Sequence, residues 1–178
     1  MRQRFSNHRR PTISRLLPPI LLSGAVLLQM TLGPFVKISG VHPDLVVLLV
    51  IGWVILRGVG AGLGWALIGG LSLDLVSSAP FGVFTLTMLV VALAASISHG
   101  RVFGSSIVLP LSLTFPLSVL FNGLALLLLN LLGRPVLWEE ALVYVIIPAA
   151  IFDTVVMMLV FPLLYLLNRA LNPQPLSF

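Results

Sequence analysis

Three aspartates lie in or beside stretches of the chain that are otherwise apolar: Asp44, Asp74 and Asp153. Moving a charged side chain into hydrocarbon costs at least ~2.5 kcal/mol, so each intramembrane carboxylate is a candidate functional group. Asp74 lies within GGLSLDLVSSAPFG, residues 69–82, and Asp153 lies ten residues into a later apolar run. The roles open to such groups are ion or proton transfer, contact with a partner, and hydrogen bonding between helices.

Each aspartate also has a structural interpretation. Asp44 follows Pro43, and a carboxylate at a helix start complements the helix dipole, so capping is its favoured role. Asp44 could alternatively share one outward-facing site with Asp74. Asp74 could instead satisfy backbone groups at the turn that follows it, with the serines of that turn as donors. Pro148 frees a backbone carbonyl that a protonated Asp153 could bond.

The motifs of catalytic and metal sites are missing from the sequence. The three histidines do not share the spacing of a metal site, and no serine lies in a G-x-S-x-G setting. Glu139 and Glu140 are adjacent and so cannot both face one substrate on a helix. The glycine-rich stretch at residues 58–64 lacks the lysine and the preceding strand of a phosphate loop. We therefore expect no enzyme activity, no metal and no cofactor.

The composition requires a lipid environment. Of the 178 residues, 58% are hydrophobic and only 8% are charged, whereas a soluble domain carries about 25% charged residues. So few charges cannot cover a surface that faces water. The chain has no cysteine, which excludes disulfides and thiolate metal sites. We expect an all-α integral membrane protein.

Six apolar stretches predict a bundle of about six transmembrane helices, since one span needs ~20 mostly apolar residues. The predicted spans are residues 16–36, 43–57, 59–78, 82–99, 105–132 and 143–167. Residues 1–14 would form a basic cytoplasmic tail, 15–170 the transmembrane domain, and 171–178 a short cytoplasmic C-terminal tail. We expect Pro110 and Pro116 to kink the fifth span or to leave its start interfacial, and Trp138 to anchor the loop before the sixth.

Basic residues predict the orientation of these spans. Alternation puts eight basic residues on the side of the N-terminal tail and only Lys37 and Arg134 on the other. Such a bias is typical of a protein with both termini in the cytoplasm. The basic tail is expected to contact anionic lipid headgroups rather than nucleic acid. The residues that set the topology are Arg9, Arg10, Arg15, Arg57, Arg101 and Arg169.

Small residues recur at every fourth position before Asp74: Gly58, Gly62, Ala66 and Gly70. On an α-helix each step of four residues drifts by only ~40°, so these positions form one slowly winding ridge. Small residues at this spacing let a neighbouring helix approach closely. We expect a helix-packing ridge that ends in a carboxylate facing a neighbouring helix or a wet cleft.

Residues 42–90 resemble the rod shape-determining protein MreD family of bacteria. They read HPDLVVLLVIGWVILRGVGAGLGWALIGGLSLDLVSSAPFGVFTLTMLV. The shared elements are a Pro-Asp helix start, an arginine that ends this helix, a glycine-rich helix that ends in G-x-x-x-D-L, and a turn that ends in glycine. These elements are Pro43, Asp44, Arg57, Gly70, Asp74 and Gly82. The turn differs, because this chain has serines and alanine where the family often has glycines.

The resemblance implies a non-catalytic protein of the inner membrane that helps organise peptidoglycan synthesis and cell shape. In that family the protein associates with the single-span protein MreC, beside RodA and a class B penicillin-binding protein. The family is grouped with the S components of energy-coupling-factor transporters, which implies a similar six-helix fold and a rival function as a substrate-binding transporter subunit. An S component needs convergent polar groups in a cavity, and this chain offers few. We expect Asp74 and the ridge to shape an outward-facing half that contacts MreC.

Overall fold

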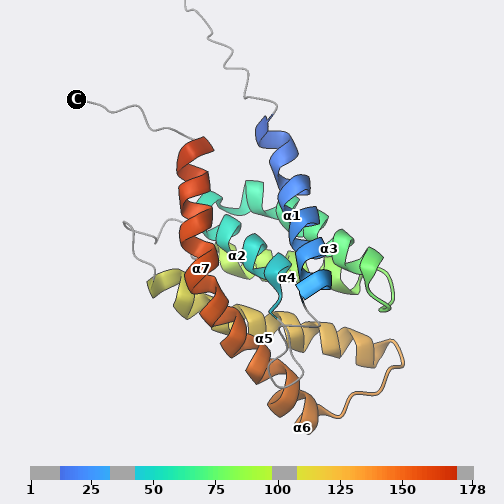
Figure 1. Cartoon of the computed structure of the whole chain (residues 1–178). Helices are drawn as coiled ribbons and strands as arrows, with labels where there is room; N and C mark the ends of the chain where they lie inside the picture. The colour runs from blue at the N-terminus through green and yellow to red at the C-terminus, as the bar shows by residue number, and fades with distance from the viewer. Residues whose placement is uncertain (1–12, 33–42, 98–107, 172–178) are drawn as a thin grey trace, which may run out of the picture.

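A computed structural model describes residues 13–32, 43–97 and 108–171, and the structural statements below refer to these residues. They are helical, without a strand, and they form a single bundle (Figure 1). The helices are α1 (Ile13–Leu32), α2 (Leu45–Arg57), α3 (Val59–Val76), α4 (Val83–Ser96), α5 (Val108–Leu131), α6 (Trp138–Ala141), the π-helix η1 (Leu142–Ile146) and α7 (Ile147–Leu171).

The α2 helix is the centre of the bundle. Nine of its 13 residues are buried, as expected for a helix that is hydrophobic on all sides. It contacts α1, α3, α4, α5 and α7. A helix of this length rises only ~20 Å, less than the ~30 Å of bilayer hydrocarbon. Its two ends therefore cannot both reach the membrane surface. Because Arg57 is at one end of the bundle, the other end of α2, at Leu45, lies inside the bundle.

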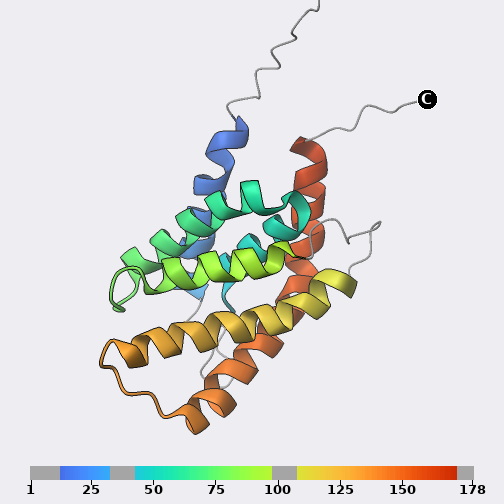
Figure 2. The same ribbon diagram turned by 180° about the vertical axis from the view of Figure 1, so that it is seen from behind.

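The other helices surround α2 in sequence order. Figure 2 shows α3, α4 and α5 side by side, with α7 crossing α5, and these neighbours are in contact. α1 packs on α3 and α2. Because consecutive helices are joined by short turns where the chain is described, α3 and α4 form an antiparallel pair with the turn at residues 77–82.

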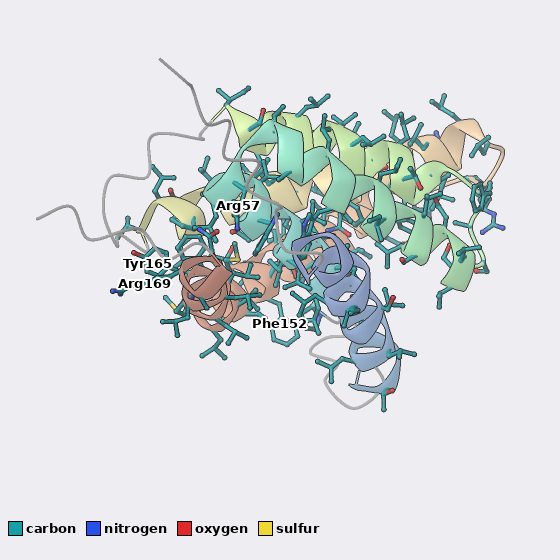
Figure 3. The ribbon with its side chains drawn as sticks, turned by 90° about the horizontal axis from the view of Figure 1, so that it is seen from above. Arg57, Phe152, Tyr165 and Arg169 are labelled. Carbon is teal, nitrogen blue, oxygen red and sulfur yellow. The ribbon has the colours of Figure 1, made fainter. Side chains whose placement is uncertain are left out.

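The first and last helices have their outer ends on the same side of the molecule (Figure 1). Arg57 at the end of α2 donates its Nε–H to Asn168 Oδ1 of α7 at 2.5 Å. The Arg57 guanidinium also lies 5.4 Å from the centre of the Trp53 ring. Figure 3 looks down on this end, with Arg57 beside α7 and with Tyr165 and Arg169 on the outer side of α7. Four basic or aromatic side chains thus lie toward one end of the bundle.

The helices overlap the predicted spans, with one difference at the last helix. α5 is continuous through Pro110 and Pro116, and the kink or interfacial start expected there stays a prediction. The last helix begins at Trp138 rather than at residue 143, because α6, η1 and α7 follow one another without a gap. Glu139 and Glu140 lie in the first turn of this helix, where acidic side chains favour a helix start. Residues 33–36, 98–99 and 105–107 of the predicted spans lie outside the described residues.

The predicted all-α membrane fold is confirmed. Three helical segments are long and apolar enough to cross a bilayer, namely Val59–Val76, Val108–Leu131 and Trp138–Ala170. Three further apolar helices are shorter, at Ile20–Gln29, Leu45–Arg57 and Val83–Ser96. When α6, η1 and α7 are counted as one continuous helix, the described residues contain six helices.

Candidate functional site: buried carboxylates that join helices

Asp74 caps the helix that follows its own. It is buried near the end of α3, with 4% of its surface exposed. Its Oδ1 accepts the N–H of Phe84 at 2.9 Å, and its Oδ2 accepts the N–H of Thr85 at 3.0 Å and the hydroxyl of Thr85 at 2.5 Å. Both amides belong to the first turn of α4, where backbone N–H groups have no partner within the helix. Asp74 therefore provides the cap for α4.

The local sequence explains why the cap comes from α3. The N-cap position of α4 is Gly82, which has no side chain and has a φ of 99°, a conformation that favours glycine. A helix start without its own capping side chain needs an acceptor from elsewhere. The donors to Asp74 are Phe84 and Thr85, not the serines that the sequence suggested, and Ser77 Oγ instead accepts the N–H of Ala79 at 3.1 Å.

The small residues of the predicted ridge meet two different neighbours. A Cβ atom at Gly62 would overlap the Val54 side chain of α2, whereas one at Gly70 would lie 2.5 Å from the Thr85 Cα of α4. The winding of ~40° per step turns successive positions toward different helices. Ala66 between them is fully buried. Gly58 precedes α3 and joins it to α2 with a φ of 78°. The close approach at Gly70 brings Thr85 to Asp74, one helical turn away.

A second group of polar residues joins four helices, and we call it the polar junction. It consists of Gln29 in α1, Asp44 before α2, Ser118 in α5 and Asp153 in α7. Gln29 donates its side-chain N–H to Asp44 Oδ1 at 2.9 Å. The backbone N–H of Asp44 donates to Asp153 Oδ1 at 2.9 Å, and the Ser118 hydroxyl donates to Asp153 Oδ2 at 2.5 Å. Asp153 and Ser118 are fully buried.

The polar junction provides acceptors from other helices for backbone N–H groups at the start of α2. Asp44 occupies the N-cap position of α2, where the sequence places it, but its carboxylate makes no capping hydrogen bond to α2. Asp153 accepts the Asp44 N–H, and Gln29 Oε1 accepts the Val46 N–H at 3.5 Å. Because α2 starts inside the bundle, its first amides must find acceptors on neighbouring helices rather than in water. α1 and α7 supply them.

Asp44 and Asp74 belong to separate clusters, because the residues that bond to Asp74 are all in α4 and those named for Asp44 are in α1 and α7. The hydrogen bonds therefore place these two carboxylates in different sites. Asp153 accepts hydrogen bonds from the Asp44 N–H and the Ser118 hydroxyl, and its bond to the carbonyl freed by Pro148 stays a prediction. Pro43, the other candidate in this region, is partly exposed.

The chemistry of both clusters is that of carboxylates held by hydrogen-bond donors of the protein. Each oxygen of Asp74 and Asp153 accepts at least one amide or hydroxyl hydrogen. Within residues 13–32, 43–97 and 108–171, no three His, Asp or Glu side chains come together as ligands for a metal ion. The arrangement is suited to holding helix ends in fixed positions, since a buried polar group with its partners in place specifies one packing.

A family model for the rod shape-determining protein MreD matches residues 10–171. The chain belongs to the MreD family. The match reaches from the N-terminal tail to the end of α7, so the resemblance at residues 42–90 is part of a much longer one. As a member of the MreD family the chain is a membrane protein of a family that determines cell shape. No curated protein and no solved structure matches it.

Three residues of this MreD-family site were not among the candidates from the sequence. Gln29 donates to Asp44, Thr85 donates twice to Asp74, and Ser118 donates to Asp153. Thr85 could have been found from its place three residues after Gly82, at the start of a predicted helix. Ser118 lies one turn before Asn122, which donates to the Ser118 carbonyl at 3.0 Å, but nothing in its own neighbourhood indicates Asp153 as its partner.

The arginines that were predicted to set the topology are only partly described. Arg57 and Arg169 lie at the end of the bundle where α7 finishes (Figure 3). Arg9, Arg10 and Arg101 lie outside the described residues, and of Arg15 only the helical backbone is described. On another side, the Arg134 side chain donates to the Ser78 carbonyl at 2.9 Å, so the connection between α5 and α6 meets the turn between α3 and α4.

Proposed function

We propose that this MreD-family protein is a non-catalytic scaffold of the cell-wall elongation complex and that it binds the single-span protein MreC. The family match over residues 10–171 carries the proposal. The hydrogen bonds support it, because the buried carboxylates accept donors from neighbouring helices and thereby join these helices. RodA and a class B penicillin-binding protein would act in the same complex, with the chemistry of synthesis on those proteins.

We also propose that the protein lies in the bacterial inner membrane with both termini in the cytoplasm. The outer ends of α1 and α7 are on one side of the molecule (Figure 1), which agrees with an even number of spans. Arg57 and Arg169 are at the same end (Figure 3), as the positive-inside rule requires of a cytoplasmic face. A reporter enzyme fused to each terminus would test this orientation.

Within the scaffold, we propose that the α3–α4 pair presents the surface that MreC contacts. Its turn exposes large apolar side chains, with Leu75 exposed by 75% and Phe81 by 68%. The Asp74 cap and the Gly70 contact fix α4 against α3 directly beside these side chains. A change at either position would alter how the turn is presented without removing the exposed residues themselves.

The test is co-purification of MreC together with rescue of rod shape in cells that lack the native protein. Asp74→Leu and Gly70→Leu should each reduce both, at normal levels of the variant in the membrane. Gly64→Leu is the matched control, because a Cβ at Gly64 meets no atom within 4 Å. Full MreC binding and normal shape in both variants would exclude this role for the α3–α4 pair. Failure of the unaltered protein to retain MreC would exclude the partnership, and tight binding of a vitamin would favour the transporter function instead.

A further inference from the structure

The longest helix of the protein exceeds what a simple membrane crossing requires. Helices α6, η1 and α7 continue from Trp138 to Leu171 without a break. At ~1.5 Å per residue the rise from Trp138 to Arg169 is about 47 Å. Bilayer hydrocarbon is ~30 Å thick, and the bilayer with its headgroup layers is ~40–45 Å thick. One end of this helix must therefore reach past the hydrocarbon.

The tryptophan and the two tyrosines of this helix are spaced to match the layers of a bilayer. The rise from Tyr144 to Tyr165 is about 32 Å, and at the average transmembrane tilt of ~20° it projects to about 30 Å, the thickness of the hydrocarbon. With the same tilt, Trp138 and Arg169 project to about 44 Å apart, the thickness with both headgroup layers. Tyr165 and Arg169 lie together at one end (Figure 3), and α6 is at the other (Figure 1).

The end of α5, the start of α6 and η1, and the connection between α5 and α6 also carry exposed apolar side chains, which together we call the far-end patch. Its residues are Leu131, Leu132, Leu137, Trp138, Leu142 and Tyr144, all exposed in the isolated chain. They come from the end of α5 and from the start of the long helix. Exposed charges, Arg134, Glu139 and Glu140, lie among them in the sequence. Apolar side chains, aromatic rings with polar atoms and charged groups gather in this way where a protein meets lipid headgroups.

We propose that the far-end patch binds the lipid headgroup interface on the side of the membrane away from Arg57 and Arg169, and that the long helix thereby sets the depth of the protein in the bilayer. Trp138 lies among the headgroups, and Tyr144 lies at the edge of the hydrocarbon. Tyr165 and Arg169 occupy the corresponding layers on the opposite side. This assignment rests only on insertion of the helix in a membrane, so it does not depend on whether MreC is the partner.

The three tryptophans of the chain make the assignment measurable. Trp53 and Trp65 are buried and stack with their ring centres 4.5 Å apart, whereas Trp138 is 42% exposed. The Trp53→Phe/Trp65→Phe variant leaves Trp138 as the only tryptophan. Purified full-length protein is reconstituted into phosphatidylcholine vesicles whose acyl chains carry bromine either near the headgroup or near the bilayer centre, and tryptophan fluorescence is recorded with and without aqueous iodide. In case the double variant does not fold, the difference between native protein and Trp138→Phe gives the same signal.

A matched reporter in the middle of the helix calibrates the depth. Val155 is exposed and lies halfway between Tyr144 and Tyr165, so Val155→Trp in the Trp53→Phe/Trp65→Phe/Trp138→Phe background should be quenched most by bromine near the bilayer centre. Trp138 should be quenched several-fold more by bromine near the headgroup than by central bromine, and only weakly by iodide. Strong iodide quenching without bromine quenching would place the patch in water and overturn the proposal. Protection from both quenchers would show that protein covers the patch, which would overturn it as well.

Discussion

Asp74 and Asp153 are both buried aspartates whose two carboxylate oxygens accept hydrogen bonds. They differ in how far along the sequence their hydrogen-bond donors lie. The partners of Asp74 are ten and 11 residues away, in the next helix. Those of Asp153 are 35 and 109 residues away. The same side chain thus closes a local turn in one place and ties distant helices together in the other. The difference shows that the structural role of a buried carboxylate in a membrane helix depends on which groups donate hydrogen bonds to it. Its depth in the helix does not determine that role.

The comparison predicts how much of the bundle is destabilised when either aspartate is replaced. Without Asp74 the first turn of α4 loses its acceptors, while the α3–α4 turn still keeps the two helices adjacent in the chain. Without Asp153 the Asp44 N–H and the Ser118 hydroxyl lose their common acceptor, and no short turn joins α7 to α2, which lies far from it in the sequence. The polar junction should therefore matter more to global stability than the Asp74 cap does.

The largest effect is expected from Asp153→Leu. This change leaves two donors without this acceptor, each at a cost of ~1–3 kcal/mol, so the free energy of unfolding should fall by about 2–6 kcal/mol. Thermal unfolding in detergent, followed by loss of the monodisperse peak, measures it. Asp153→Asn is the matched control, because its amide oxygen can still accept one of the two hydrogens, and it should lose less. Equal stability of Asp153→Leu and the native protein would contradict the importance of the polar junction.

The next effect concerns the helix contact beneath the cap. Gly70→Ala puts a Cβ 2.5 Å from the Thr85 Cα, and because the obstacle is backbone, α4 must move. Overpacking of this kind costs typically ~1–3 kcal/mol. Gly64→Ala in the same helix meets nothing within 4 Å and should be neutral or slightly stabilising. The thermal assay compares the two variants, and similar behaviour would show that α3 and α4 do not approach as closely as described.

Removal of the cap should have a smaller and local effect. Asp74→Ala should lower the free energy of unfolding by about 0.5–2 kcal/mol, the range for loss of an N-cap side chain. Hydrogen exchange measured by mass spectrometry should show faster exchange of the amides of Phe84 and Thr85, with the amides of α7 unchanged. Asp74→Asn keeps one acceptor oxygen and should be intermediate. Faster exchange throughout the bundle would contradict the distinction between the two clusters.

The smallest signal, and the most direct test of the comparison, is a double-mutant cycle. No residue belongs to both clusters, so Asp74→Ala and Ser118→Ala should lower stability additively, within ~0.5 kcal/mol. Ser118→Ala combined with Asp153→Asn should not be additive, since these residues share one hydrogen bond. Coupling between Asp74 and Ser118 as large as that between Ser118 and Asp153 would mean that the two clusters form one network.

Much of the fold could be predicted from the sequence because it depends on local properties. Long apolar runs predict the helices, and the regular spacing of Gly62, Ala66 and Gly70 predicts close packing. The identity of the neighbours could not be predicted in this way. Two steps of the ridge rotate it by ~80°, so Gly62 faces α2 and Gly70 faces α4, and spacing alone does not choose between them.

In the candidate site, too, contacts between residues close in sequence could be predicted, whereas contacts between distant residues could not. The sequence leaves Asp74 open between hydrogen bonding to the nearby backbone and contact with a partner, and its donors Phe84 and Thr85 are close in sequence. Asp44 and Asp153 were singled out separately, and nothing in either segment indicates a hydrogen bond across 109 residues. Such a pairing follows from the position of α2 at the centre of the bundle, which is a property of all the helices together.

The central position of α2 has a consequence for synthesis of the protein. α2 and Asp44 leave the ribosome early, but Asp153, which accepts the Asp44 N–H, is made 109 residues later. A growing chain that has inserted α2 must therefore hold it in the membrane without α7, and the Asp44 N–H lacks the Asp153 acceptor until α7 is made. Chains that stop short of α7 should be recognised by membrane proteases, because arrival of the C-terminal helix is the event that closes the bundle.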